Sequence, residues 1–265
     1  MGDRKVLYER EGAVGHIMLN RPDEANALDL DTTKELYDAA VAAAGDPQVR
    51  VLLLEARGPM FCAGGDLKHF VSFREQRSEL GTEILRMTTY LHGAISHFNR
   101  MAAPVVCKIQ GTAAGGGLSL AMSCDLVFAA RSVKFSLAYT AAGLSPDGSS
   151  TYFLPRLVGL RRARELMLTN RRFTAEEALA MNMIDRVCDD ARLDAEVARE
   201  VEHLATGPTE AYGAVKRLLL ASAGGTLESQ MDAESREISR AVQSPDGIEG
   251  VSAFAEKRAP AFVGG

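Results

Sequence analysis

Two glycine-rich segments, "FCAGGDL" (61–67) and "AAGGGLSL" (113–120), have the composition of loops that bind a ligand through their backbone. Each follows an apolar segment and precedes a helical one, so we expect each to run from a strand into a helix. Glycine lets the backbone approach a ligand closely, and the helix N-terminus behind it leaves N–H groups unpaired. Two such N–H groups aimed at one point form an oxyanion hole, which suits a carbonyl oxygen that becomes an anion.

The same glycines can instead serve close packing between a strand and a helix, and either loop alone is explained by packing. One loop after each of two similar strands favours the oxyanion hole. A phosphate-binding loop has less support, because the chain has neither G-x-x-x-x-G-K-[ST] nor G-x-G-x-x-G with an acidic partner.

A carboxylate, Asp147, lies in the segment "GLSPDGSSTYFLP" (143–155). Pro-Asp-Gly is common in turns, and Asp147, Ser149 or Ser150 can each cap the helix that follows. The residue types therefore leave two roles open for Asp147: shaping a turn, or presenting a carboxylate to a substrate.

The elements that must position these residues are predicted to alternate between strands and helices. A hairpin is expected over 5–20 with its turn at Glu11-Gly12, and apolar runs predict strands over 49–56, 105–109, 125–130 and 133–137. One long helical region is expected over about 66–101. This order indicates an α/β fold with repeated β-β-α units.

The remainder of the chain is predicted to be helical. Thr174 with Glu177 is typical of a capping box, and Ser244-Pro245 is typical of an N-cap followed by proline at the first helical position. We therefore divide the chain into a core, 1–195, and a C-terminal helical region, 196–265.

Composition and simple motifs argue against several classes of protein. The 265 residues carry a net charge of −5, from 30 Lys+Arg and 35 Asp+Glu, which argues against nucleic-acid binding. Four cysteines without CxxC or metal-ligand spacing indicate reduced thiols in a cytoplasmic protein, and no metal site is expected. The N-terminus lacks a signal-peptide core, and the longest uncharged apolar stretch, 109–124, is short and glycine-rich, so no membrane contact is expected.

A family resemblance rests on "NRPDEANAL" (20–28), "FCAGGDL" and the segments 104–130, 154–178 and 254–262. Over essentially its whole length the chain resembles the crotonase (enoyl-CoA hydratase/isomerase) superfamily. The resemblance implies a crotonase-like spiral of β-β-α repeats and a C-terminal helical trimerisation region, hence a homotrimer or hexamer. It also implies an acyl-CoA thioester substrate, with coenzyme A entering as part of that substrate and no separate cofactor.

The resemblance further implies roles for individual residues. The oxyanion donors are expected at the N–H groups of Gly65 and Gly116. Contacts with coenzyme A are expected at Ala25, Ala63, Gly64, Asp66 and Leu67, and at Lys257 of the same or a neighbouring subunit, which would meet the nucleotide phosphates.

The acids that this family uses to add water are missing. Hydratases carry two glutamates, and the corresponding positions here are Ser119 and Tyr139. Serine barely ionises and tyrosine has an ordinary pKa of about 10, so neither readily serves as a general base near neutral pH. Asp147 matches the position at which some isomerases of the family place their catalytic acid. We therefore expect an enoyl-CoA isomerase that uses Asp147.

Other functions remain open. The family's 4-chlorobenzoyl-CoA dehalogenase branch uses an aspartate at the Asp147 position as nucleophile and a histidine at the His92 position. It also uses tryptophan where this chain has Tyr139, and this chain has no tryptophan. Hydration by an unusual acid set is a further alternative, and a protein that binds acyl-CoA without turnover is the non-enzymatic one.

Two more residues have structural interpretations. Asp125 is expected to pair with a buried arginine such as Arg156 or to cap a turn. Cys62 is expected to be a small apolar filler beside the first glycine loop.

Overall fold

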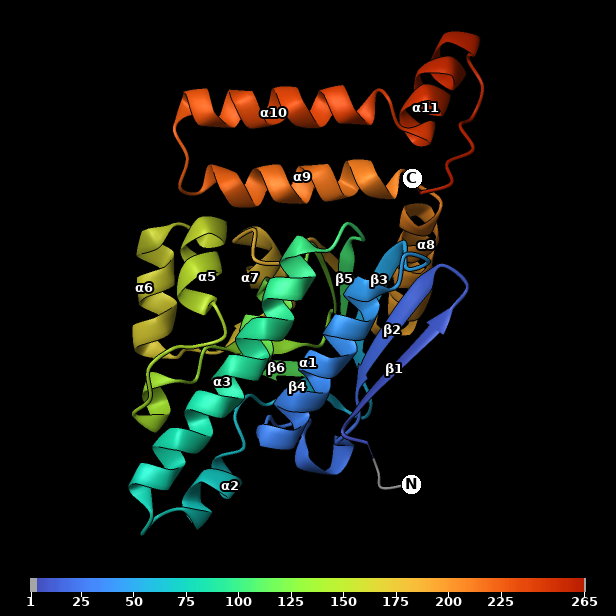
Figure 1. Ribbon diagram of the computed structural model, residues 1–265. Coiled ribbons are helices and arrows are strands. Elements are labelled where there is room, and N and C mark those ends of the chain that lie inside the picture. The colour runs from blue at the N-terminus through green and yellow to red at the C-terminus, as the bar shows by residue number, and fades with distance from the viewer. Residues whose placement is uncertain (1–3, 265) are drawn as a thin grey trace.

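Two β-sheets form the centre of the protein. The computed structural model describes residues 4–264 (Figure 1). The larger sheet has the order β1-β2-β3-β5-β7-β10 and the smaller one β4-β6-β8-β9. Their strands are β1 (Val6–Glu11), β2 (Val14–Leu19), β3 (Val51–Ala56), β4 (Met60–Cys62), β5 (Val105–Ile109), β6 (Thr112–Ala114), β7 (Leu126–Ala130), β8 (Lys134–Ser136), β9 (Phe173–Thr174) and β10 (Arg186–Cys188).

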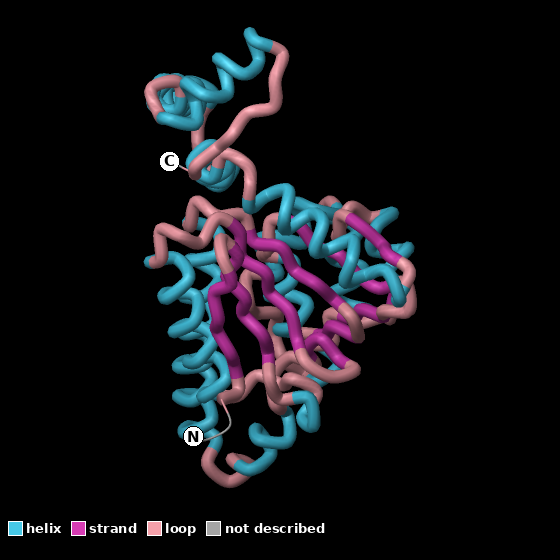
Figure 2. Tube along the Cα trace, turned by 90° about the vertical axis from the view of Figure 1, so that its right-hand side faces the viewer, coloured by secondary structure: helices cyan, strands magenta, loops and turns pink. Residues whose placement is uncertain are grey.

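The larger sheet begins with the predicted hairpin and continues as parallel strands. β1 and β2 are antiparallel, and Gly12, with φ +58°, makes the turn between them. From β2 to β10 every neighbouring pair is parallel. β3 is buried along almost its whole length, as expected of a parallel strand covered on both faces. Figure 2 shows these strands side by side.

Helices cover both faces of the larger sheet. The helices α1 (Leu30–Gly45) and α3 (Arg77–Arg100) pack against each other on one side, and α8 (Leu193–Ala205) packs against β3, β5 and β7. The remaining helices of the core are α2 (Leu67–Ser72), α4 (Gly116–Met122), α5 (Ser150–Val158), α6 (Leu160–Thr169) and α7 (Ala175–Ala180). The expected boundary between 195 and 196 falls inside α8, and the division into two regions stays a prediction.

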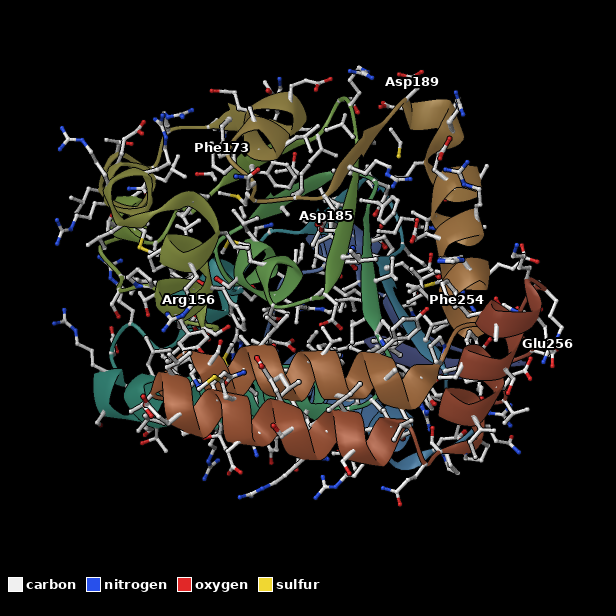
Figure 3. All side chains as sticks on the ribbon, turned by 90° about the horizontal axis from the view of Figure 1, so that it is seen from above. Arg156, Phe173, Asp185, Asp189, Phe254 and Glu256 are labelled. Carbon is white, nitrogen blue, oxygen red and sulfur yellow. The ribbon has the colours of Figure 1, made fainter. Side chains whose placement is uncertain are left out.

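The C-terminal helices α9 (Thr209–Ser222), α10 (Leu227–Ala241) and α11 (Pro245–Glu256) lie above the core in Figure 1. Viewed from above in Figure 3, α9 and α10 lie side by side. Lys216 ties α9 to the core, because its Nζ donates to the carbonyl oxygens of Phe98 and Ala103 and pairs with Asp125 at 2.6 Å. Large apolar side chains remain exposed here, namely Val215, Leu219, Leu227, Met231, Ile238, Val242, Ile248, Val251 and Phe254.

The α/β class and both predicted helix starts are confirmed. Thr174 and Glu177 form the capping box, and Ser244 caps α11 with Pro245 in its first turn. The predicted partner of Asp125 is wrong: Lys216 takes that place, while the Arg156 guanidinium lies 3.7 Å over the ring of Tyr152.

Several short elements differ from the prediction. The long helical region over 66–101 is two helices, α2 and α3, separated by a turn at 73–76. Part of each glycine-rich segment expected as a loop is a strand, β4 in the first and β6 in the second, and the region predicted as helical contains β9 and β10. Strands of two or three residues are too short to show a period of two, and tertiary pairing creates them.

Candidate active site

A cavity of about 340 Å³ lies where three strands of the smaller sheet end. β4, β6 and β8 are parallel neighbours, so their carboxyl ends meet at one edge. The chain leaving each strand lines the cavity, at Ala63 and Gly65 after β4, Gly115 and Gly116 after β6, and Tyr139 after β8. This edge is where α/β sheets commonly bind ligands.

The Gly65 N–H is aimed by a short backbone pairing with Leu28. The Leu28 N–H donates to Gly64 O at 2.8 Å, and the Asp66 N–H donates to Leu28 O at 2.9 Å. In a trans peptide the C=O and the next N–H point in opposite directions. Because Gly64 O points toward Leu28, the Gly65 N–H points away from it. Within residues 4–264 no protein acceptor receives this N–H.

The Gly116 N–H is aimed by the start of α4. Gly115 O accepts the backbone N–H of Ser119 at 3.0 Å and its hydroxyl at 3.1 Å. The Gly115 carbonyl therefore points along the helix, and the N–H of Gly116, the first helical residue, points the other way. In the described part of the chain this N–H also has no protein acceptor.

The two glycine loops are in direct contact. Gly64 has φ +90°, and a Cβ on it would lie 2.9 Å from Ala114 O and 3.1 Å from Gly116 N. Only glycine fits this position. The contact brings the unpaired N–H groups of Gly65 and Gly116 to one wall of the cavity, an arrangement able to bind an anionic oxygen.

Asp147 is the only carboxylate among the described residues that line the cavity. Its backbone oxygen accepts the N–H of Ser150 at 3.1 Å and the hydroxyl of Ser150 at 2.9 Å, so the backbone makes the turn into α5. The side chain does not cap α5. A Cβ on Gly116 would lie 3.9 Å from Asp147 Oδ1, so the carboxylate stands beside the wall that carries the N–H groups.

Tyr139 and Ser119 form a hydrogen-bonded chain behind Asp147. The Tyr139 hydroxyl donates to Asp147 Oδ1 at 2.6 Å and lies 2.8 Å from Ser119 Oγ. Ser119 is fully buried. Burial, together with the adjacent Asp147 carboxylate, raises the pKa of Tyr139 far above its ordinary value. Tyr139 therefore stays protonated and acts as a hydrogen-bond donor.

His92 contacts the Asp147 loop from outside the cavity. It lies on α3 with its side chain exposed, and its Nε2 accepts the Gly148 N–H at 3.3 Å. It does not line the cavity. A catalytic role for His92 stays a prediction, and the contact with Gly148 was not foreseen from sequence.

The residues expected to contact coenzyme A are only partly gathered at the cavity. Ala63 and Leu67 line it, whereas Gly64 and Asp66 lie in the same loop without lining it. Ala25 does not line the cavity, but its carbonyl oxygen accepts the N–H of Ala63, which does, at 3.0 Å. Lys257 lies outside this cavity, exposed at the end of α11. Their binding roles stay predictions.

Cys62 is fully buried at the end of β4, beside the first glycine loop. Burial raises the pKa of its thiol to about 12. A thiol held neutral in this way agrees with the expected role as a small apolar filler.

Most of the cavity wall consists of apolar side chains, and of these only Leu67 was expected at the site from sequence motifs. They are Leu28, Leu67, Phe70, Leu80, Ile84, Leu85, Met87, Leu91 and Leu144. Leu80, Ile84, Met87 and Leu91 follow a spacing of four, three and four residues, which places them on one face of α3. That helical periodicity was the one feature of the sequence that could have indicated these wall residues. The wall suits an apolar acyl group.

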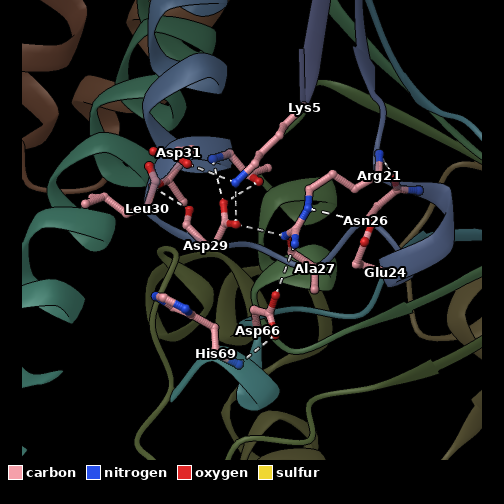
Figure 4. Close-up of polar contacts among 12 residues, drawn as sticks. Lys5, Arg21, Glu24, Asn26, Ala27, Asp29, Leu30, Asp31, Asp66 and His69 are labelled. Carbon is pink, nitrogen blue, oxygen red and sulfur yellow. Dashed lines mark hydrogen bonds and ion pairs between the residues drawn. The ribbon is translucent and has the colours of Figure 1, made fainter. Parts of the chain in front are cut away.

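A charged cluster lies behind the Gly65 loop (Figure 4). Arg21 pairs with Asp29 at 3.3 Å and with Asp66 at 3.2 Å, and Lys5 pairs with Asp29 at 2.7 Å. Burial opposes ionisation of Asp29, but the hydrogen bonds from Lys5 and Thr32 and the charge of Arg21 outweigh it and lower its pKa to about 2. Asp29 is therefore ionised near neutral pH.

Two further properties concern residues 4–264 only. No group of three or more His, Cys, Asp or Glu side chains there is placed to hold a metal ion. In the same range, every helix is too short or too polar to span a lipid bilayer.

Known proteins resemble this chain over nearly its full length. A family model described as enoyl-CoA hydratase/isomerase matches residues 9–265. The 1,2-epoxyphenylacetyl-CoA isomerase of Escherichia coli K12 is 36% identical, over 98% of each chain. The 4-chlorobenzoyl coenzyme A dehalogenase-2 of an Arthrobacter species is 31% identical, over 96% of this chain and 92% of the relative. The crystal structure of an enoyl-CoA hydratase from Polaromonas sp. JS666 superimposes with a TM-score of 0.90 at 29% identity, covering 97% of this chain and 99% of that chain.

Proposed function

The chain belongs to the enoyl-CoA hydratase/isomerase family, and we propose that it is an acyl-CoA isomerase in which Asp147 moves a proton between carbons of an enoyl thioester. The observation that carries the proposal is that Asp147 is the one carboxylate lining the described cavity, beside two unpaired N–H groups. The family match confirms the resemblance read from the motifs, and the structural match confirms the crotonase-like spiral.

The reaction begins with the thioester carbonyl oxygen between the N–H groups of Gly65 and Gly116. Asp147 takes a proton from C2 of a 3-enoyl thioester, and the electron pair of the broken C–H bond enters a conjugated enolate. The N–H groups stabilise the negative oxygen, each by about 10²–10³ in rate. The protonated Asp147 then returns the proton to C4, which moves the double bond to C2–C3. The overall step conserves atoms and electrons and requires neither a metal nor a redox cofactor.

The cavity supports an apolar acyl group as substrate. Its wall is formed by the leucines, Ile84, Met87 and Phe70 described above. None of the described residues that line it carries a positive charge. A free carboxylate on the acyl group would therefore be buried without a partner, at a large cost in binding free energy. The carboxyl-bearing thioesters are therefore expected to be poor substrates.

The rest of the thioester extends from the mouth of the cavity. The backbone near Ala25, Ala63, Gly64, Asp66 and Leu67 would hold the pantetheine and adenine, and Lys257 would meet the phosphates. The exposed apolar side chains of α9, α10 and α11 support burial against further copies of the chain, as a homotrimer or hexamer.

The alternatives have less support from the site. Hydratases of the family use two carboxylates, and the described residues that line the cavity include only Asp147. At the two glutamate positions, Ser119 and Tyr139 bind each other, and Tyr139 binds Asp147. In a dehalogenation, Asp147 would be the nucleophile. The 31% identity to a dehalogenase makes this reaction an alternative that the experiment must test. The dehalogenase branch has a functional histidine at the His92 position, yet His92 does not line the cavity here and its Nε2 accepts the Gly148 N–H.

A panel of thioesters tests the proposal. It contains 3-hexenoyl-CoA, 2-hexenoyl-CoA, 1,2-epoxyphenylacetyl-CoA and 4-chlorobenzoyl-CoA, with products read by absorbance and mass in water labelled with ¹⁸O. Conversion of the 3-enoyl to the 2-enoyl thioester without a change of mass is expected. Gain of one labelled water would indicate a hydratase, release of chloride a dehalogenase, and tight binding of every thioester without turnover an acyl-CoA-binding protein. Each of the last three results, alone, overturns the proposal.

A further inference from the structure

We infer that Arg21 is a positioning residue that aims the Gly65 N–H at the substrate carbonyl. The inference rests on the proposed role of Gly65 as an oxyanion donor. Arg21 does not line the cavity, so it acts through the backbone that it holds.

Arg21 joins three acceptors, two of them in the segment after β2 and one in the loop after β4. Its Nη1 donates to Ala27 O at 2.6 Å and pairs with Asp29 at 3.3 Å, and its Nη2 donates to Asp66 Oδ2 at 3.2 Å (Figure 4). The side chain is only 13% exposed, so these contacts are poorly screened by solvent. One guanidinium therefore fixes the loop after β2 against the loop after β4.

The two ends of this brace flank the pairing that aims Gly65. Ala27 directly precedes Leu28, and Asp66 directly follows Gly65. Leu28 is bonded to Gly64 O and to the Asp66 N–H. By holding Ala27 and Asp66 together, Arg21 holds both sides of that pairing at a fixed separation.

Rotation of one peptide plane is the motion that the brace opposes. Gly64 and Gly65 are adjacent glycines, so their backbone has more conformational freedom than any other dipeptide. If the pairing with Leu28 loosens, the peptide between them rotates and its N–H leaves the carbonyl oxygen. A misplacement of about 1 Å at a reacting centre costs roughly 10²-fold in rate.

The chemistry of the brace requires arginine. A planar guanidinium presents several N–H donors in a fixed fork and can reach a carbonyl and two carboxylates together. A lysine keeps the charge but has one nitrogen, which cannot span acceptors on both sides of the pairing. Lys5 provides the contrast within the cluster, because it binds Asp29 and Asp31 and contacts neither Ala27 nor Asp66.

The test measures polarisation of a bound carbonyl, which a purely structural role would leave unchanged. The probe is hexanoyl-CoA labelled with ¹³C at the thioester carbonyl, a saturated ligand that cannot isomerise, read by isotope-edited infrared difference spectroscopy. The variants are Arg21→Met and Arg21→Lys, with Lys5→Met as the matched control. Affinity for the probe, thermal midpoint and, where turnover exists, kcat and KM accompany each spectrum.

In the unsubstituted protein the carbonyl stretch is expected at lower wavenumber than in water. Arg21→Met should lose a large part of this shift, Arg21→Lys a smaller part, and Lys5→Met none, even if Lys5→Met lowers the thermal midpoint. Turnover in the Arg21 variants should fall about 10- to 100-fold in kcat with KM within roughly threefold.

A full shift in a folded Arg21 variant overturns the inference, as does absence of binding or of any shift in the unsubstituted protein. If Arg21→Met does not fold, Arg21→Lys decides by the same criterion. The spectrum does not depend on turnover. A shift that requires Arg21, in a protein that isomerises no thioester, therefore supports the inference while the proposed reaction fails.

Discussion

The Tyr139 hydroxyl donates a hydrogen bond to Asp147 Oδ1 at 2.6 Å. One carboxylate oxygen is thereby occupied, and the other is left for a substrate. The pairing also holds the carboxylate beside Gly116, so the base and the anion-binding groups keep a fixed relation.

Replacement of Asp147 by asparagine is expected to abolish isomerisation while preserving binding. Asparagine has nearly the same shape but cannot take up a proton, and general acid–base catalysis is worth about 10²–10⁴ in rate. Steady-state kinetics should show a loss of kcat of that size, with the dissociation constant of hexanoyl-CoA within about threefold. Asp189→Asn changes an exposed aspartate and serves as the control. Equal turnover by Asp147→Asn would remove Asp147 from the mechanism.

Tyr139→Phe is expected to reduce kcat about 10- to 100-fold, because a hydrogen bond to a charged group is worth about 1.5–3 kcal/mol. KM should change little, since the ring remains in the cavity wall. Tyr152→Phe, outside the cavity, is the matched control. An unchanged kcat in Tyr139→Phe would contradict the proposed orientation of Asp147.

Two adjacent glycines should respond differently to alanine. A Cβ on Gly116 would lie 3.3 Å from Leu28 and 3.9 Å from Asp147 Oδ1, so Gly116→Ala is expected to fold and to obstruct the site. A Cβ on Gly117 would lie 2.5 Å from both Cβ and O of Cys62, so Gly117→Ala should destabilise the protein by about 1–3 kcal/mol. Denaturant titration and kinetics on both variants measure this. A stable, fully active Gly116→Ala would contradict the assigned position of the thioester.

Asp29 makes stability depend on pH in the acid range. Its pKa is lowered from 3.8 to about 2 in the folded protein, so its contribution is complete above the unfolded value and disappears as pH falls through about 2. A shift of this size corresponds to about 2 kcal/mol. Asp29→Asn preserves a side chain that can cap the helix. In this variant the free energy of unfolding should depend less steeply on pH between pH 5 and 2. Identical slopes in the two proteins would contradict this origin.

The parts of the site that follow from local sequence were predictable. Adjacent glycines after apolar runs predicted both loops. Asp147, which does line the cavity, was expected instead from the family resemblance, because Ser119 and Tyr139 occupy the positions of the hydratase glutamates. Three-residue strands such as β4 and β6 were not predictable, because their existence depends on pairing with each other. The same holds for Lys216, which reaches Asp125 from a helix 91 positions later in the chain, since a salt bridge leaves no local pattern. Location in the cytoplasm stays a prediction.

The two N–H groups proposed to hold the thioester oxygen belong to the main chain, at Gly65 and Gly116. A point mutation can remove a side chain, but only a change to proline removes a backbone N–H. On the proposed mechanism, substitution of a side chain can displace these two donors but does not remove them, whereas a change at position 119, 139 or 147 alters the reacting groups themselves. On this mechanism, the reaction is open to change at three side chains while the main chain that would bind the substrate oxygen stays the same.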